Sequence, residues 1–212
     1  MLPSRHFIFQ PAAHPCEPSL APLPGHYGST RSLGHPGTAN RFSTPPFPSR
    51  RMDLIAKLLP VTNIVLDLEV GNKKRAFEQA GLLFENNQGI ARSVVFDSLF
   101  DREKLGSTGL GQGIAIPHGR IRGLKEARGA FLRLAAPVPF ESPDGKPVHI
   151  MFVLLVPDQA TEQHLQILSE LAQRFSDRGF RDALIAAESA DDVHRLFADW
   201  GNHAPDQHRA AV

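Results

Sequence analysis

The 212-residue chain holds a single cysteine, Cys16, and its formal net charge is only +1. One cysteine excludes an internal disulfide framework and a thiolate zinc cluster, and it fits a reducing cytoplasm. No run of about 18 apolar residues is present, so we expect no insertion into a membrane. The small net charge gives no sign of nucleic acid or of an anionic membrane as partner. The hydrophobic content of 42% is that of a globular domain.

The first 51 residues have little of what folding requires. They hold 10 of the 18 prolines and five arginines against one acidic residue, and they show no apolar period. Residues 45–48, Pro-Pro-Phe-Pro, favour neither a helix nor a paired strand. We therefore expect residues 1–51 to be a disordered extension, residues 52–201 to be one domain, and residues 202–212 to be a flexible tail. A transit peptide, or an extension ahead of a working start at Met52, are the alternatives for the first segment.

The first half of the domain shows one strand pattern and two helix patterns. Residues 64–70 alternate apolar and polar side chains, which predicts a half-buried strand. Asn72 is suited to cap a helix that ends near residues 86–89. Its apolar stripe is Ala76, Phe77, Ala80, Leu83 and Phe84. A second helix is predicted from about residue 92 to 105, with Gly106 just past its end. It should bury Val95, Phe96, Leu99 and Phe100.

The second half adds strands and further helices. A glycine-rich strand region runs to Pro117, and strands are predicted over residues 130–134 and 148–156, joined by a proline-rich turn over 137–147. The continuous apolar run of the last strand indicates helices on both faces of the sheet. A long helix over 162–176 and short helices over 180–187 and 190–200 follow, with Ser189 and Asp192 as a capping box. The long helix should bury Leu165, Leu168, Leu171, Ala172 and Phe175. The pattern predicts a three-layer α/β domain.

The least ordinary stretch is glycine-rich, with six of the domain's 13 glycines between Gly106 and Gly123. Such a stretch forms tight turns, or it offers exposed N–H donors to an anion. It lacks the Gly-Lys-Ser/Thr of a phosphate-binding P-loop, and it follows a helix instead of opening one as a dinucleotide fingerprint does. His118 comes directly after Pro117, which we expect to stop the strand ladder. A neutral imidazole held there is a competent nucleophile, although a solvent-exposed loop histidine is the plainer interpretation.

Residues 102–109, Arg-Glu-Lys-Leu-Gly-Ser-Thr-Gly, and residues 113–119, Gly-Ile-Ala-Ile-Pro-His-Gly, resemble the active-site signature of enzyme IIA proteins. These are phosphocarriers of the phosphoenolpyruvate-dependent phosphotransferase system, in the fructose/mannitol superfamily. Residues 154–157 and the pair His164-Leu165 also match, and the resemblance runs from about residue 54 to 200. It is strongest to the nitrogen-regulatory type, whose domain stands alone. It implies a mixed β-sheet flanked by helices.

The resemblance also implies a mechanism. His118 would accept a phosphoryl group on Nε2 from an HPr-like phosphocarrier protein, Arg102 would contact the phosphoryl oxygens, and His164 would assist. Regulation of target proteins by contact would follow, with no cofactor and no metal of the protein's own. The remaining pocket residues implied are Ser107, Thr108 and Gly113.

Plainer interpretations stay open for these residues. Arg102 could be a surface charge of its helix and His164 a helix-surface histidine, while Ser107 and Thr108 could merely form the turn. Glu103 is as easily a solvated carboxylate as a pocket residue. His149 precedes a buried strand and is interpreted as structural.

Three other functions compete with the regulatory carrier. A sugar-specific IIA component would pass its phosphate to a membrane permease subunit, and the signature does not separate the two. A non-catalytic binding module of the same fold, as in anion exchangers, would not need His118, Arg102 and His164 together. A zinc hydrolase would need a third ligand such as Glu162 beside the two histidines. Nucleic acid is not expected as a partner, because residues 52–212 carry a net charge of −3.

Overall fold

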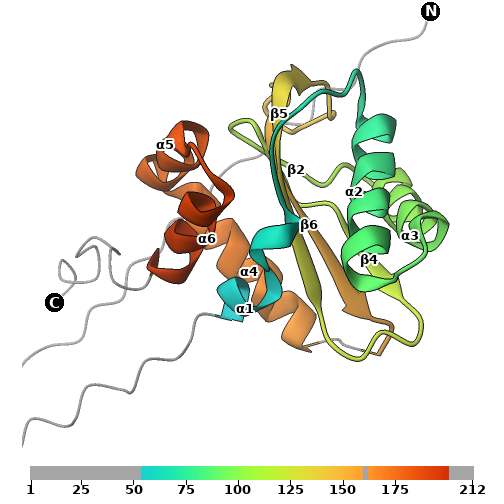
Figure 1. The fold of residues 1–212 in the computed structure, drawn as a ribbon. Coiled ribbons are helices and arrows are strands. Elements are labelled where there is room, and N and C mark those ends of the chain that lie inside the picture. The colour runs from blue at the N-terminus through green and yellow to red at the C-terminus, as the bar shows by residue number, and fades with distance from the viewer. Residues whose placement is uncertain (1–53, 160–161, 201–212) are drawn as a thin grey trace, which may run out of the picture. The chain divides into compact units, whose positions relative to one another are not determined.

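The computed structural model describes residues 54–159 and 162–200 of the chain. The predictions of a disordered extension over residues 1–51 and of a flexible tail over 202–212 lie outside these described residues. Within them, helices and strands follow one another as in an α/β domain (Figure 1). None of the described helices combines the length and the apolar character that crossing a membrane requires.

A mixed sheet forms the middle layer, with the strand order β1-β5-β6-β3-β2, and β4 also pairs with β6. β1 runs parallel to β5, β5 antiparallel to β6, and β3 and β4 both parallel to β6. β6 is therefore central, which explains why residues 150–156 are all buried. The strands are Ile64–Leu68 (β1), Gly109–Gly111 (β2), Ile114–Ala115 (β3), His118–Ile121 (β4), Arg128–Val138 (β5) and Val148–Pro157 (β6).

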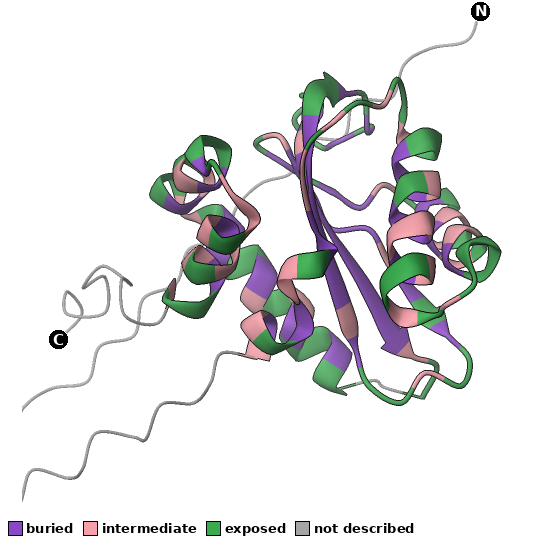
Figure 2. Cartoon of the chain, in the orientation of Figure 1, coloured by how far each residue is buried: buried purple, intermediate pink, exposed green. Residues whose placement is uncertain are grey.

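Helices cover both faces of the sheet (Figure 1). One face carries α2 (Lys73–Gln88) and α3 (Arg92–Lys104). The other carries α1 (Leu54–Leu58), α4 (Glu162–Ser176), α5 (Arg178–Ala186) and α6 (Ala190–Ala198). Each face has its own apolar cluster, because alternate residues of a strand point to opposite sides: Phe152 belongs to one cluster and Val153 to the other. The buried residues follow the sheet in Figure 2. The prediction of a three-layer α/β domain with a mixed sheet is confirmed.

The signals at the ends of α2 act as the sequence predicts. The side chain of Asn72 accepts a hydrogen bond from the backbone N–H of Arg75 at 2.9 Å, so it caps the helix. Gly89 takes a left-handed φ of 67°, and its N–H donates to the carbonyl of Glu85. This backbone conformation ends the helix at Gln88.

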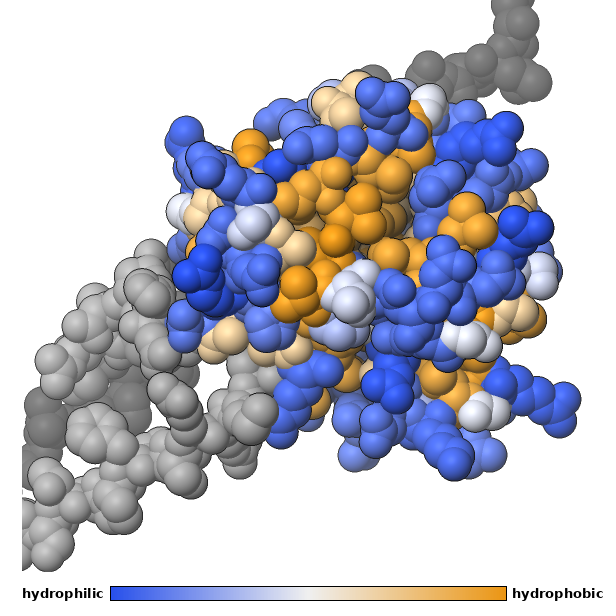
Figure 3. Space-filling view, in the orientation of Figure 1, coloured by the Kyte–Doolittle hydropathy of each residue, from blue (hydrophilic) through white to orange (hydrophobic). Residues whose placement is uncertain are grey.

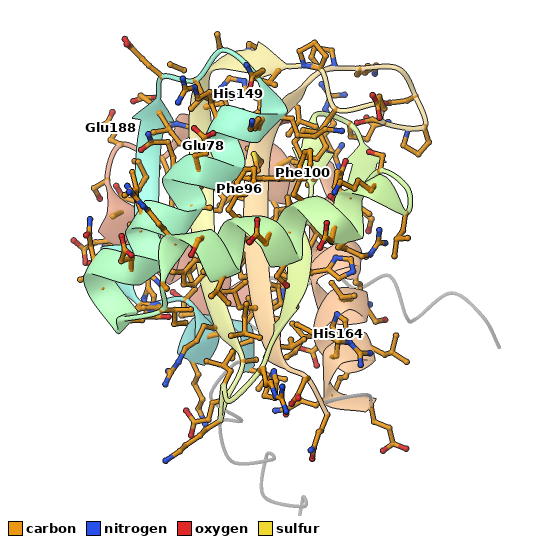
Figure 4. The ribbon with its side chains drawn as sticks, turned by 90° about the vertical axis from the view of Figure 1, so that its right-hand side faces the viewer. Glu78, Phe96, Phe100, His149, His164 and Glu188 are labelled. Atoms are coloured by element: carbon orange, nitrogen blue, oxygen red, sulfur yellow. The ribbon has the colours of Figure 1, made fainter. Side chains whose placement is uncertain are left out.

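The stripe predicted for α3 is only partly correct. Val95, Leu99 and Glu103 are buried, whereas Phe96 and Phe100 are half-buried at the side of this narrow stripe. The two rings stack on each other with centroids 5.4 Å apart (Figure 4).

The face predicted for α4 is only partly correct, because Leu171 and Phe175 are buried as predicted and the other three residues are not. The buried residues are His164, Ile167, Leu171, Arg174 and Phe175. Leu165 is instead 67% exposed, Ala172 is exposed, and Leu168 is half-buried. Both sets keep a helical spacing, so the sequence pattern alone did not choose between them. The helix turns so that His164 faces the sheet, where β4 begins.

β5 is longer than the predicted strand over residues 130–134 and contains the buried Arg133. Its guanidinium donates to the carbonyl of Ile185 at 2.9 Å and to that of Ala187, at the end of α5. It also forms a two-pronged ion pair with Asp67 of β1, at 3.2 and 3.1 Å. The carbonyls and the carboxylate together supply the hydrogen-bond acceptors that a buried guanidinium needs. The capping box that starts α6, Ser189 with Asp192, is confirmed.

β1 lies at one edge of the sheet. Figure 3 shows hydrophobic side chains gathered over it, between α2 and α6. Val65, Leu66 and Leu68 are half-buried there. Asp67 has a positive φ of 54°, and the register of β1 with β5 shifts between Val65 and Leu68.

Candidate active site

His118 is the first residue of β4 and pairs with Leu154 of β6. The prediction that Pro117 stops the strand ladder is partly correct, because β3 ends at Ala115 and residues 116–117 belong to no strand. Proline lacks an N–H, but its carbonyl still accepts a hydrogen bond from the N–H of Leu154 at 2.9 Å. Pairing with β6 resumes at His118, so its half-buried ring is held on a paired strand instead of in a loop.

The two ring nitrogens of His118 have different partners. Nδ1 lies 2.9 Å from the carbonyl oxygen of Ile116, and Nε2 lies 3.0 Å from Nε of Arg102. A carbonyl only accepts and a guanidinium only donates. In the neutral ring this network assigns the proton to Nδ1 and leaves the lone pair on Nε2. The nucleophilic nitrogen thus faces the arginine.

Arg102 is held at two points. It lies in the last turn of α3, where its Nε donates to His118 and its Nη1 donates to the carbonyl of Gly106 at 2.9 Å. Its side chain is half-buried. The interpretation of Arg102 as a plain surface charge does not account for this geometry.

His164 approaches His118 from α4, in the first turn of the helix. The two ring centroids are 5.3 Å apart, and the rings meet edge to face at 62°. His164 is only 9% exposed, so it is not a helix-surface histidine. Its Nε2 is buried and has no hydrogen-bond partner among the described residues. A group bound to His118 would find a polar atom there without a competing bond.

Burial lowers the pKa of both histidines, which favours the neutral imidazole at pH 7. Burial is the main cause that lowers the pKa of His118 below its ordinary value of 6.5, and the charge of Arg102 lowers it further. The hydrogen bond to Ile116 and the charge of Glu103 oppose this effect. Burial also lowers the pKa of His164, followed by the charges of His118, Arg120 and Arg102. A neutral imidazole is the form with a free lone pair.

The remaining predicted pocket residues lie around the site without facing His118. The hydroxyl of Ser107 donates to the carbonyl of Phe140, and that of Thr108 donates to Glu103. Both therefore hold the turn after α3. The structure does not bring Gly113 to His118: its carbonyl accepts from the N–H groups of residues 149 and 150, which lie five and four positions along β6 from Leu154, the pairing partner of His118.

His149 and His164 lie far apart in the fold. His149 lies at the start of β6, and Figure 4 shows it at the opposite end of the molecule from His164. Within residues 54–159 and 162–200, no group of three histidine, cysteine or acidic side chains lies close enough to hold a metal ion. Glu162 is therefore not a third ligand beside His118 and His164.

Sequence reasoning missed several contributors to this site. The carbonyl of Ile116 selects the tautomer of His118, a contact with no signature in the side-chain pattern. Glu103, interpreted as equally a solvated carboxylate, is buried. Gly119 lies so close to Ser98 of α3 that a Cβ at position 119 would be 2.3 Å from the serine hydroxyl. Only the tertiary fold shows these approaches.

A half-buried histidine whose Nε2 lies against an arginine, on a strand of a mixed sheet, has the chemistry to accept a group on its imidazole. The chain belongs to the enzyme IIA type 2 family of the phosphoenolpyruvate-dependent sugar phosphotransferase system, whose family model matches residues 57–200. The resemblance drawn from the sequence is thereby confirmed.

Individual relatives place the chain within this family. A nitrogen regulatory protein of Pseudomonas aeruginosa is 40% identical over 149 residues, 70% of this chain and 97% of that protein. The crystal structure of the nitrogen regulatory protein IIA-Ntr from Neisseria meningitidis is 55% identical, with a TM-score of 0.65, over 68% of this chain and 99% of that one. A fructose-specific EIIA component of Haloferax volcanii is 33% identical over 146 residues, 68% of this chain and 95% of that protein. The chain is thus similar to regulatory and to sugar-specific members.

Proposed function

We propose that this chain is a phosphohistidine carrier of regulatory type. His118 accepts a phosphoryl group from an HPr-like phosphocarrier protein, and the phosphorylation state controls contacts with target proteins. The observation that carries the proposal is the setting of His118: Nδ1 lies against the carbonyl of Ile116, Nε2 accepts from Arg102, and the ring meets that of His164. The cytoplasmic location stays a prediction.

The proposed transfer of the phosphoryl group exchanges one N–P bond for another. The lone pair of His118 Nε2 attacks the phosphorus, a new N–P bond forms, and the N–P bond of the donor phosphohistidine breaks. The electron pair of the broken bond returns to the donor ring. His118 keeps its proton on Nδ1, and the hydrogen bond to the carbonyl of Ile116 supports the positive charge that the ring gains.

Arg102 and His164 have the chemistry to hold the transferred group. Once Nε2 carries phosphorus, the guanidinium loses its acceptor on His118 and lies within reach of the phosphoryl oxygens. Such charge-assisted hydrogen bonds contribute about 1.5–3 kcal/mol each. His164, whose ring meets that of His118, offers a buried nitrogen without a hydrogen-bond partner among the described residues.

The surroundings of the site favour a protein as donor. Leu105 is 84% exposed and follows the turn of α3 that carries Arg102, while Leu165 is 67% exposed and follows His164. Large exposed apolar side chains beside a reactive group are typical of a docking surface for another protein.

The regulatory role is preferred over sugar transport because of the similarity to proteins named for nitrogen regulation. A phosphoryl group adds about −1.5 to −2 charges to the docking surface, enough to attract one partner and repel another. The alternative, a sugar-specific IIA component, predicts instead that the phosphoryl group passes on to a permease subunit.

The test is phosphorylation in a reconstituted relay. The chain is incubated with phosphoenolpyruvate, the first enzyme of the relay and an HPr-like carrier, and should gain one acid-labile phosphate. His118→Ala should abolish the label, whereas His164→Ala and Arg102→Ala should slow labelling but leave the site available. Normal labelling of His118→Ala would show that another residue is the acceptor. If the unmutated chain accepts nothing from any carrier, it is a non-catalytic binding module.

A further inference from the structure

Glu103 is a buried carboxylate that accepts hydrogen bonds from three donor groups. Its side chain is 4% exposed. Oε1 accepts from the ammonium of Lys73, the first residue of α2, at 3.0 Å. Oε2 accepts from the backbone N–H of Thr108 at 3.0 Å and from the hydroxyl of Thr108 at 2.6 Å. A buried charge is tolerated only with such a full set of partners.

These contacts fix the short loop between α3 and β2 at its far end. Thr108 is tied to Glu103 by two donors, and its own carbonyl accepts from the N–H of Ile116 at 3.0 Å. Ile116 is the residue whose carbonyl holds Nδ1 of His118. The loop that Glu103 anchors is therefore bonded to the segment that leads into the reactive histidine.

The near end of the same loop holds Arg102. The N–H of Gly106 donates to the carbonyl of Glu103 at 3.1 Å, and the carbonyl of Gly106 accepts from Nη1 of Arg102. An arginine side chain has many rotamers, so it holds one position only where its acceptors are themselves fixed. The two acceptors here are the carbonyl of Gly106 and Nε2 of His118.

We propose that Glu103 is a positioning residue, which holds the loop so that Gly106 directs the guanidinium of Arg102 onto Nε2 of His118. Glu103 does not touch the reacting atoms and acts only through Arg102. The inference rests on the proposed function, in which Arg102 supports transfer to His118. It adds a structural requirement: Lys73, Glu103 and Thr108 must stay joined for the arginine to be in place.

The decisive variant is Glu103→Gln, read first without any phosphocarrier. One side of the amide is an NH₂ group, which must point at a donor, either Lys73 or Thr108, so at least one contact is lost. In the unmutated chain the Nε–H of Arg102 is hydrogen-bonded, and its NMR signal should exchange slowly with water. In Glu103→Gln this signal should exchange faster or vanish, while the backbone spectrum stays that of a folded protein.

Asp101→Asn is the matched control. It removes one negative charge two positions away on the same helix, but among the described residues Asp101 pairs with the surface residue Lys104 and not with the loop. In Asp101→Asn the NMR signal of the Arg102 Nε–H should exchange as slowly as in the unmutated chain. If Glu103→Gln lowers the melting temperature but leaves the Arg102 signal as it was, Glu103 is merely structural and the inference is wrong.

A second pair of variants covers the case in which Glu103→Gln does not fold. Thr108→Ser keeps both donors to Glu103, whereas Thr108→Val keeps the shape and the N–H but loses the hydroxyl. The Arg102 signal should therefore be protected in Thr108→Ser and weakened in Thr108→Val. Equal protection in both would contradict a role for the Glu103–Thr108 contact.

Transfer kinetics separate this inference from the proposed function. With saturating phosphocarrier, Glu103→Gln should lower kcat about 10- to 100-fold and leave KM nearly unchanged, because a shift of Arg102 affects the reaction more than docking. Wild-type kcat in Glu103→Gln would refute the positioning role alone. If the unmutated chain accepts no phosphate although its Arg102 signal responds to Glu103→Gln as described, the proposed function fails alone.

Discussion

Gly119 lies where β4 passes closest to α3, one residue after His118. A Cβ atom at this position would lie 2.3 Å from Oγ and 3.0 Å from Cβ of Ser98, whose hydroxyl donates to the carbonyl of Arg120 at 2.9 Å. Gly119→Ala must therefore push the strand and the helix apart. Because α3 also carries Arg102, we expect the 3.0 Å contact between Arg102 and His118 to lengthen.

The size of the effect follows from the overlap. Forcing a methyl group into a packed interface costs about 1–3 kcal/mol of folding stability. Ser98→Gly removes the two closest atoms and alone costs about 1–2 kcal/mol, from the lost hydrogen bond and a glycine within a helix. If the overlap with Ser98 destabilises Gly119→Ala, the double variant Gly119→Ala/Ser98→Gly should be more stable than the sum of the two single losses predicts, by about 1 kcal/mol or more.

The assay is urea unfolding of these variants together with their rates of phosphoryl acceptance. Gly71→Ala is the matched control, because a Cβ there meets nothing within 4 Å, and it should change stability by less than about 0.5 kcal/mol. Gly119→Ala should slow acceptance about tenfold or more, and Ser98→Gly should restore part of the rate. Additive stability losses, or wild-type acceptance by a destabilised Gly119→Ala, would refute the reasoning.

Three further predictions concern pH, the core and the N-terminal segment. The rate of phosphoryl acceptance should be constant near neutral pH and fall in acid with a midpoint below pH 6.5, because burial and Arg102 lower the pKa of His118. In Arg102→Ala the midpoint of the pH–rate profile should be higher. An unchanged midpoint would show that the charge of Arg102 does not lower the pKa of His118. Arg133→Met should cost about 2–4 kcal/mol in denaturant unfolding, because it leaves buried carbonyls at the end of α5 unpaired. Asp67→Asn should cost less than about 1 kcal/mol, since the carboxylate of Asp67 is 70% exposed. Equal losses of stability in Arg133→Met and Asp67→Asn would show that the ion pair, and not the carbonyl contacts, accounts for the role of Arg133. A chain that begins at Met52 should keep the melting temperature and the phosphoryl acceptance of the full chain, and loss of either would show that residues 1–51 are needed.

The order and type of most elements could be predicted because their signals are local. Asn72 and Ser189 cap helices with partners only three residues away, so the sequence contains the whole interaction. α1 was not predicted, because a five-residue helix has no period of its own and depends on packing of Ile55 and Leu58 into the core. The face of α4 needed the sheet as well: spacing allows either Leu165 or His164 to be buried, and only the neighbouring strand decides.

The candidate site shows the same division between local and remote contacts. The resemblance named Arg102, His118 and His164, and the fold brings these three together. It could not show that Glu103 is buried, because its ammonium partner is 30 residues away in another helix. The resemblance also implied Gly113 as a pocket residue, but β3 lies between Gly113 and His118, which separates their positions along β6.

The positive φ of Asp67 has a consequence for how the protein meets other copies of itself. β1 is an edge strand under a hydrophobic surface, and such an edge invites a foreign strand to add to the sheet. The kink at Asp67 leaves only residues 64–66 as a straight row of donors and acceptors, too short to hold an added strand. Its exposed carboxylate also places a charge at the point where pairing would continue. An interrupted edge with a charged side chain disfavours strand addition, so we expect Asp67, which also pairs with Arg133, to limit extension of the sheet between molecules.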